Sequence, residues 1–230
     1  VTWDILGLSV IDTGTLIEPA VNGQGDLFVG YTNTIMTIAI LGLDQSFIRF
    51  YHEPPGGLSK KGLFRVCFFF SGLVLVAVGV LCSTLLVDVI HGAIGFSVIG
   101  RQAVPMLFLN ALFFMAIRYF IVLYRMEMSI KTYTIIVILN QLFYKLFYLL
   151  GAIFPNPVLS MSICSMVGLG GFALVFRFLR RDTLRPRAAE FRGGAYKTLL
   201  PYGLAADPQA VFVTFNGLPP KPYPVNPLGV

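Results

Sequence analysis

Five polar side chains interrupt two long apolar segments of this 230-residue chain, and they are its strongest candidates for chemistry. Arg118 and Asn110 lie in one segment, and Lys145, Gln141 and Asn140 lie in the next. An ionised group inside a membrane costs at least about 2.5 kcal/mol on insertion scales, so such groups usually face a protein interior or an aqueous cavity. Two cations beside one cavity suit an anionic group such as phosphate or pyrophosphate.

Helical spacing divides these five residues into two sets. Gln141 is four residues before Lys145 and Asn140 is next to it, so the three polar groups occupy one sector of a helix. At 100° per residue, Asn110 and Arg118 point within about 80° of each other. We therefore predict that all five line a substrate cavity. Two alternatives stay open: Arg118 extends to the inner membrane interface, or the second set makes interhelical hydrogen bonds that serve only packing.

Motifs for enzymatic or metal-dependent chemistry are lacking. The two histidines, His52 and His91, form no HExxH motif, and Gly23 and Gly25 do not extend into a dinucleotide- or phosphate-binding loop. The three cysteines lie in apolar segments without a CxxC pair. We therefore expect neither an enzyme nor a metal or cofactor site.

Composition places the chain in a membrane. Hydrophobic residues make up 56% of it and charged residues only 12%, with a mean hydropathy of +0.78, whereas a soluble domain carries about 25% charged residues. A membrane-spanning helix takes about 20 apolar residues, so the length leaves room for five or six spans. The expected fold is all-α: a polytopic helical membrane protein with one transmembrane bundle of about five spans and room for a sixth.

Five apolar segments within residues 27–179 are the predicted spans: residues 27–43, 66–87, 103–124, 133–154 and 157–178. Pro155 and Pro157 separate the last two, because proline removes a backbone donor and keeps the preceding residue out of the helical region. Before the bundle, residues 1–26 are predicted to be irregular or altered. After it, we expect a basic cytoplasmic connection over residues 180–202 and a proline-rich, disordered tail over residues 203–230.

Lysine and arginine alternate between rich and poor connections along these spans. The connections after the first, third and fifth segments are rich, whereas those after the second and fourth contain only Arg101. Cytoplasmic loops of membrane proteins carry the excess of basic residues, so the rich connections are predicted to be cytoplasmic. The net charge of +6 then reflects orientation, and we expect contact with membrane lipid rather than a nucleic-acid partner.

Residues 41–53, with the sequence LGLDQSFIRFYHE, resemble a passage in bacterial polysaccharide flippases of the multidrug/oligosaccharidyl-lipid/polysaccharide superfamily. In that family a Gly-Leu-Asp-Gln-Ser/Ala-Phe-x-Arg-x-Tyr-x-Glu pattern closes the second transmembrane helix at its cytoplasmic end. The resemblance extends from Tyr31 to Gly203 and includes a Tyr-Gly pair, here Tyr202 and Gly203, that opens the seventh helix in the family. The family's first helix and its second six-helix half are not recognisable here.

The resemblance implies the amino-terminal lobe, here as a fragment, of an oligosaccharide flippase in a bacterial inner membrane. Its implied partners are an undecaprenyl-pyrophosphate-linked glycan, membrane lipid and polysaccharide-assembly proteins. By the same resemblance, Asp44, Gln45 and Arg49 form a cytoplasmic gate, while Arg118 and Lys145 face the cavity. An alternative for the motif is that Asp44 and Arg49 simply pair at a helix end. Alternatives for the chain are a cation-coupled multidrug exporter, which acidic residues within the spans would favour, and a non-transporting membrane scaffold.

The charge alternation predicts opposite sides for two connections, which cysteine labelling can test. Lys60→Cys should react with a membrane-impermeant maleimide only after the cells are opened, because it lies in a cytoplasmic connection. Gly92→Cys should react in intact spheroplasts. Both substitutions are made in a variant whose three native cysteines are serine. Labelling of Lys60→Cys from outside would overturn the orientation.

Overall fold

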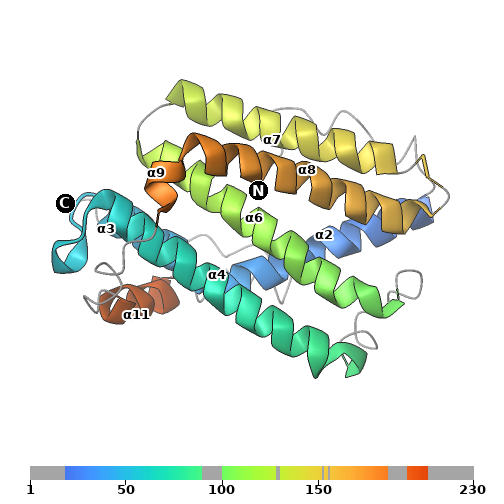
Figure 1. Ribbon diagram of the computed structural model, residues 1–230, viewed down its shortest axis with the longest axis horizontal. Coiled ribbons are helices and arrows are strands. Elements are labelled where there is room, and N and C mark those ends of the chain that lie inside the picture. Colours follow the sequence, from blue (N-terminus) through green and yellow to red (C-terminus); the bar gives the residue numbers. More distant parts are fainter. Residues whose placement is uncertain are drawn as a thin grey trace, which may run out of the picture.

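In a computed structural model, the chain is described over residues 19–89, 100–127, 130–151, 153–154, 156–185 and 196–206. Helices connected by turns, without a β-strand, make up this described part (Figure 1). The long helices are α2 (Pro19–Ile40), α4 (Lys60–Thr84), α6 (Ala103–Met126), α7 (Ile130–Gly151) and α8 (Pro157–Leu179). The shorter ones are α3 (Leu43–Phe50), α9 (Arg181–Leu184), α11 (Tyr196–Ala206) and the 3₁₀ turns η3 (Pro55–Gly57) and η4 (Gly100–Gln102).

The helices have the length and composition of membrane spans. Four of them, α4, α6, α7 and α8, are long and apolar enough to cross a bilayer. The pair α2 and α3, which is bent by 54°, supplies a fifth span if the two are counted together. The all-α, polytopic fold class is therefore confirmed, and the chain is a multi-pass membrane protein.

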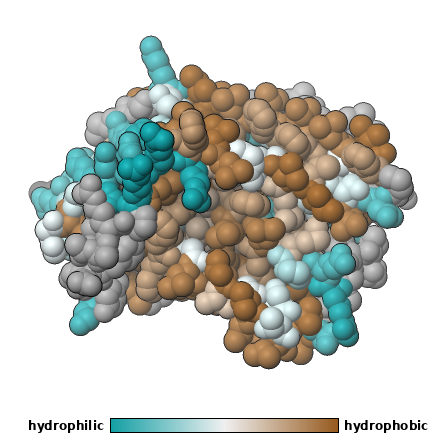
Figure 2. Space-filling model, viewed as in Figure 1, coloured by the Kyte–Doolittle hydropathy of each residue, from teal (hydrophilic) through white to brown (hydrophobic). Residues whose placement is uncertain are grey.

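Hydrophobic side chains cover the outside of the bundle as well as its core. On α7 five of the exposed ones recur at helical spacing and form a stripe: Ile135, Leu139, Leu142, Leu146 and Leu150. Figure 2 shows hydrophobic residues over most of one face of the molecule. An apolar surface of this extent is covered by another apolar phase, which for spans of this length is the lipid.

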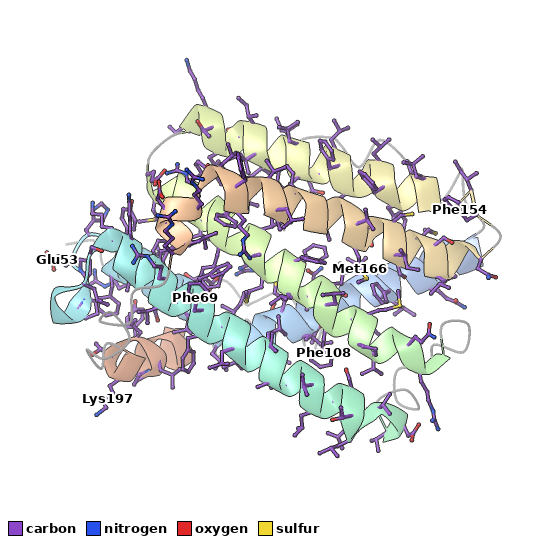
Figure 3. All side chains as sticks on the ribbon, in the orientation of Figure 1. Glu53, Phe69, Phe108, Phe154, Met166 and Lys197 are labelled. Carbon is purple, nitrogen blue, oxygen red and sulfur yellow. The ribbon has the colours of Figure 1, made fainter. Side chains whose placement is uncertain are left out.

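Aromatic rings join α4, α6 and α8 in the core. Phe64 of α4 lies 6.0 Å from Phe120 of α6, and Phe120 stacks on Phe176 of α8 at 5.1 Å between centroids. Phe108 of α6 points toward α4 (Figure 3), where its ring fills the space beside Gly79. These contacts hold the three helices at a constant depth relative to one another, which positions the polar residues described below.

Basic residues gather at one end of the bundle. Glu53 and Lys197 lie at this end and Phe154 lies at the other (Figure 3). Figure 2 shows hydrophilic residues mainly at the same end, near α3 and α9. The basic connections of the sequence meet there because α4 and α7 begin, and α6 and α8 end, at this side: Lys60, Lys61, Arg125, Lys131, Arg180 and Arg181. We refer to it as the basic end.

The first helix begins earlier than the sequence predicted. Helix α2 starts at Pro19, so residues 19–26 are helical rather than irregular, and Asp26 lies inside the helix. Residues 1–26 were predicted to lie outside the bundle because their apolar stretches are too short to span a membrane. Tertiary contact stabilises the extra turns, since Phe28 is buried and the Gly25 backbone lies against the Tyr148 hydroxyl. Residues 1–18 lie outside the described part.

A second difference concerns the basic connection. Helix α11 lies across the predicted boundary between the connection and the tail, so residues 203–206 are helical rather than disordered. It packs on α3, where the Ser46 hydroxyl donates to the Leu199 carbonyl oxygen at 2.8 Å and Phe50 contacts Tyr202. Burial of Leu199 against α3 explains why a segment with an internal proline is helical. The prediction for residues 207–230 falls outside the described part.

Two residues in the left-handed conformation interrupt the helix between α2 and α3. Leu41 has φ 53° and Gly42 has φ 67°, a conformation that costs a residue with a side chain about 1 to 2 kcal/mol. Gly42 accepts hydrogen bonds from the amides of Gln45 and Ser46 and so starts α3. The Cα atom of Gly42 lies against the backbone of Gly203 in α11, which leaves no room for a Cβ atom on Gly42. The break therefore requires glycine both in α2–α3 and in α11.

Gly42→Ala should lower stability by at least about 2 kcal/mol, because the added methyl group meets the Gly203 backbone in an unfavourable left-handed conformation. The thermal unfolding midpoint in detergent measures the effect. Gly30→Ala is the control, since Gly30 lies in α2 with open space around it, and an alanine there should leave stability equal or raise it by about 0.5 to 1 kcal/mol. Equal midpoints for the two variants would contradict the close contact.

Candidate functional site

An ion pair links the motif to helix α6 near the basic end of the bundle. Arg118 of α6 donates to Asp44 Oδ2 of α3 through Nη2 at 2.7 Å and through Nε at 3.0 Å. The other carboxylate oxygen, Oδ1, accepts from the Gln45 amide at 2.9 Å. The Asp44 side chain is only 2% exposed, whereas that of Arg118 is 40% exposed. One partner is thus buried inside the protein and the other is open on one side.

This geometry argues against one of the two readings of the motif, the pairing of Asp44 with Arg49. Asp44 pairs with Arg118, which is 74 positions away in sequence, rather than with Arg49 at its own helix end. Gln45 and Arg49 are exposed, so within the described residues only Asp44 of the three faces the bundle. The sequence predicted Arg118 to be a cation that lines a cavity. In the structure, Arg118 is paired with the Asp44 carboxylate.

The burial of Asp44 explains why the pair is needed. A carboxylate removed from water loses several kcal/mol of hydration, which an adjacent cation and hydrogen bonds must offset. Arg118 supplies the cation with two donors. The first turn of α3 supplies the Gln45 amide and a helix N-terminus, where a negative charge is favoured. Asp44 therefore fixes the start of α3 against α6.

A second polar contact holds the end of α2. The hydroxyls of Ser71 in α4 and Tyr119 in α6 are 2.8 Å apart, and Ser71 also donates to the Ile40 carbonyl oxygen at 3.5 Å. Both side chains are fully buried. Ile40 is the last residue of α2 before the break, so its carbonyl group lacks a regular helical partner. The sequence analysis missed this contact, because serine and tyrosine in an apolar segment carry no specific signal.

Asn110 faces the same side of α6 as Arg118. Its Nδ2 donates to Thr32 Oγ1 of α2 at 3.4 Å, and Thr32 donates to the Phe28 carbonyl oxygen at 2.8 Å. Asn110 is fully buried, and its Oδ1 has no partner among the described residues. Asn110 and Arg118 therefore both face the broken helix α2–α3.

The α7 residues lie at two depths. Phe114 of α6 contacts Tyr144 of α7, with 5.9 Å between ring centroids. Because the helices are antiparallel, Arg118 and Asn140 each lie four residues nearer the basic end than this contact and so share a depth. Asn140 is buried with Oδ1 unpaired among the described residues, whereas Gln141 and Lys145 are half-buried. Lys145 lies next to Tyr144, farther from the basic end.

Asp26 is a further polar residue that the sequence analysis did not select. Its carboxylate interacts electrostatically with Tyr144 and Tyr148 of α7. A usable signal was present, because Pro19 stands at the first helical position, where proline is favoured. An acidic side chain within a span is the feature that the sequence associates with cation-coupled export.

At the basic end, a surface ion pair joins the end of α8 to the end of α6. Arg180 after α8 donates to Glu127 at 2.7 Å and to the Tyr124 hydroxyl at 3.1 Å. Burial by itself lowers the pKa of Arg180, but the bond to Tyr124 and the charge of Glu127 outweigh it and raise this pKa. No set of three His, Cys, Asp or Glu side chains is placed to hold a metal ion in the described ranges.

Comparison of the chain with family models, with curated proteins and with solved structures finds no match.

Removal of either partner of the Asp44–Arg118 pair should have unequal effects. Arg118→Ala leaves a buried carboxylate without a cation and should cost about 3 kcal/mol. Asp44→Ala leaves a cation that is 40% exposed and should cost about 1 kcal/mol from the lost ion pair. The double variant should be more stable than Arg118→Ala, because it no longer buries an unpaired charge.

Unfolding of the four proteins in mixed micelles measures these differences. Equal losses for the two single variants, with additive losses in the double variant, would show that Asp44 does not depend on Arg118.

Proposed function

We propose that this chain is one lobe of a transporter that moves lipid-linked oligosaccharide across a bacterial inner membrane. The observation that carries the proposal is the Asp44–Arg118 pair. It joins the flippase-like motif of residues 41–53 to a cation on a membrane span, at the basic end of the bundle. A structural ion pair needs no exposed cation, whereas a residue that receives an anionic substrate does.

The chemistry of Arg118 suits the pyrophosphate of a lipid carrier. A guanidinium group presents a planar set of donors that matches phosphate oxygens. Asp44 engages Nε and Nη2, and within the described residues Nη1 has no hydrogen-bond partner. The N–H groups on the exposed side of Arg118 are therefore open to an approaching anion. Asn140 lies at the same depth with an unpaired carbonyl oxygen, which suits a hydroxyl group of a sugar.

The arrangement of polar groups fits alternating access. In transporters of this kind, two similar bundles rock about a central binding site. This bundle contributes one set of walls, with Asn110 and Arg118 on the side toward α2–α3 and the basic end toward the cytoplasm. A broken helix beside the site is also a recurrent feature of such transporters, and α2–α3 has this form.

Asp26 favours a second candidate, a cation-coupled drug exporter of the same superfamily. Such an exporter needs a carboxylate within a span to exchange a proton or metal cation. Asp26 lies inside α2, next to two tyrosines of α7. The flippase remains the leading proposal, because the motif of residues 41–53 resembles that of the polysaccharide branch and Asp26 is the single acidic residue in the α2 range.

Deletion of the gene from its native host, followed by complementation, tests both candidates. Loss of the protein should abolish the surface glycan and cause lipid-linked intermediate to accumulate. Lys145→Ala should reduce surface glycan at least about tenfold if the charge contributes about 1.4 kcal/mol to substrate binding. Lys131→Ala is the matched control, since Lys131 is an exposed lysine of the same helix at the basic end, and it should restore export fully.

The outcomes separate the candidates. Unchanged glycan in the deletion strain would overturn the flippase. Unchanged glycan with Lys145→Ala alone would remove Lys145 from the substrate path. Drug sensitivity in the deletion strain that Asp26→Asn fails to rescue would favour the exporter.

A further inference from the structure

The donors of Arg118 are already used by an anion of the protein itself. Both Nε and Nη2 converge on one oxygen, Asp44 Oδ2, at 3.0 and 2.7 Å. This edge of the guanidinium group is the one that binds carboxylate or phosphate with two parallel bonds. A phosphate group that takes this edge must therefore replace Asp44, since both occupants are negative and share the same hydrogen atoms.

Helix α3 stays anchored when the ion pair opens. Ser46 donates to the Leu199 carbonyl oxygen, and Gly42 lies against Gly203, so the helix is tied to α11 independently of Arg118. Phe47 is buried against Phe64 of α4, with ring centroids 5.7 Å apart. Of the contacts described here, the ion pair is the one that a water-soluble anion can replace, because the others are apolar or formed by uncharged groups.

Arg118 of α6 is the cation that contacts Asp44 among the described residues. Tyr119 of α6 and Cys67 of α4 also interact with Asp44 electrostatically. On α3 itself, the nearest charged residue is the exposed Arg49. A phenol and a thiol are ordinarily uncharged at pH 7. Removal of the Asp44 charge therefore leaves Arg118 as an uncompensated cation at this point of the bundle.

We infer that Asp44 is an internal competitor for the anion site of Arg118. Binding of a phosphate group at Arg118 displaces the Asp44 carboxylate and releases the start of α3 from α6. This inference rests on the proposed function for the biological source of the phosphate, the head group of the lipid carrier. It assigns the chemistry of the site to exchange between two anions, so that an occupied site and a closed α3–α6 contact exclude each other.

Inorganic pyrophosphate is the probe for a binding test, with the full chain in nanodiscs of phosphatidylcholine. Asp44→Asn should bind pyrophosphate at least tenfold more tightly than the unchanged chain, because the competing charge is gone. Arg118→Lys, which keeps the charge but lacks the planar donors, should bind it at least tenfold more weakly than Asp44→Asn. Isothermal titration calorimetry measures the affinity of each protein for pyrophosphate.

A matched control is provided by the ion pair between Arg101 and Asp88, which are 73% and 67% exposed. Asp88→Asn also frees an arginine from a carboxylate, but at an exposed site, so its affinity for pyrophosphate should change less than twofold. If the affinity for pyrophosphate rose equally in Asp44→Asn and Asp88→Asn, the change in net charge alone would account for the effect, and the inference would be overturned. An Asp44→Asn variant that binds no more tightly than the unchanged chain would also overturn it.

Movement of α3 is measured separately by pulsed electron paramagnetic resonance between spin labels at Gln45→Cys and Arg125→Cys, in a background without native cysteines. Gln45 and Arg125 are both exposed. Saturating pyrophosphate should lengthen the distance in the otherwise unchanged protein, and an unchanged distance would overturn the release of α3. Addition of phosphatidylglycerol to the nanodiscs, without pyrophosphate, distinguishes a membrane lipid from a soluble phosphate as the displacing group.

These results are independent of glycan export. Competition at Arg118 in a protein whose deletion leaves the surface glycan intact would keep the anion exchange and reject the flippase. Loss of glycan export in the deletion strain, without competition at Arg118, would keep the flippase and reject the anion exchange.

Discussion

A buried carboxylate within reach of one arginine organises the basic end of this bundle. Asp44 has almost no contact with solvent, so its charge must be compensated inside the protein. Arg118 meets this requirement from another helix, and the pairing joins the start of α3 to the side of α6 that faces it. The hydrogen bonds of Ser71 to Ile40 and of Ser46 to Leu199 then stabilise the two helices on either side of the break.

The break itself depends on backbone geometry rather than on charge. Leu41 and Gly42 adopt left-handed conformations, and the space beside Gly42 is filled by the backbone of Gly203. Two glycines more than one hundred residues apart thus permit a contact that neither segment makes alone. This contact brings together the two stretches that carry the flippase resemblance, the motif of residues 41–53 and the Tyr202-Gly203 pair, which packs beside it through Tyr202 and Phe50.

Polar groups on the membrane helices fall into two kinds. Ser71, Tyr119 and Thr32 satisfy one another or a nearby carbonyl group and stabilise the bundle. Asn110 and Asn140 each bury a carbonyl oxygen that has no partner among the described residues, which costs free energy in an apolar environment. Arg118 is paired and yet partly exposed. We attribute the unpaired oxygens of the two asparagines and the exposed side of Arg118 to the proposed transport of a polar head group.

The amino-acid sequence by itself determined the fold class, since hydrophobic runs of about 20 residues without charge have few alternatives to membrane-spanning helices. It also located the polar residues of α6 and α7, because a polar side chain is conspicuous in an apolar run. It did not determine that Asp44 pairs with Arg118 rather than Arg49, that Asp26 lies inside a helix, or that α11 docks on α3. Those outcomes depend on which helices meet and at what depth. Ring packing between α4, α6 and α8 and the left-handed break decide them, and neither is a property of a local stretch of sequence.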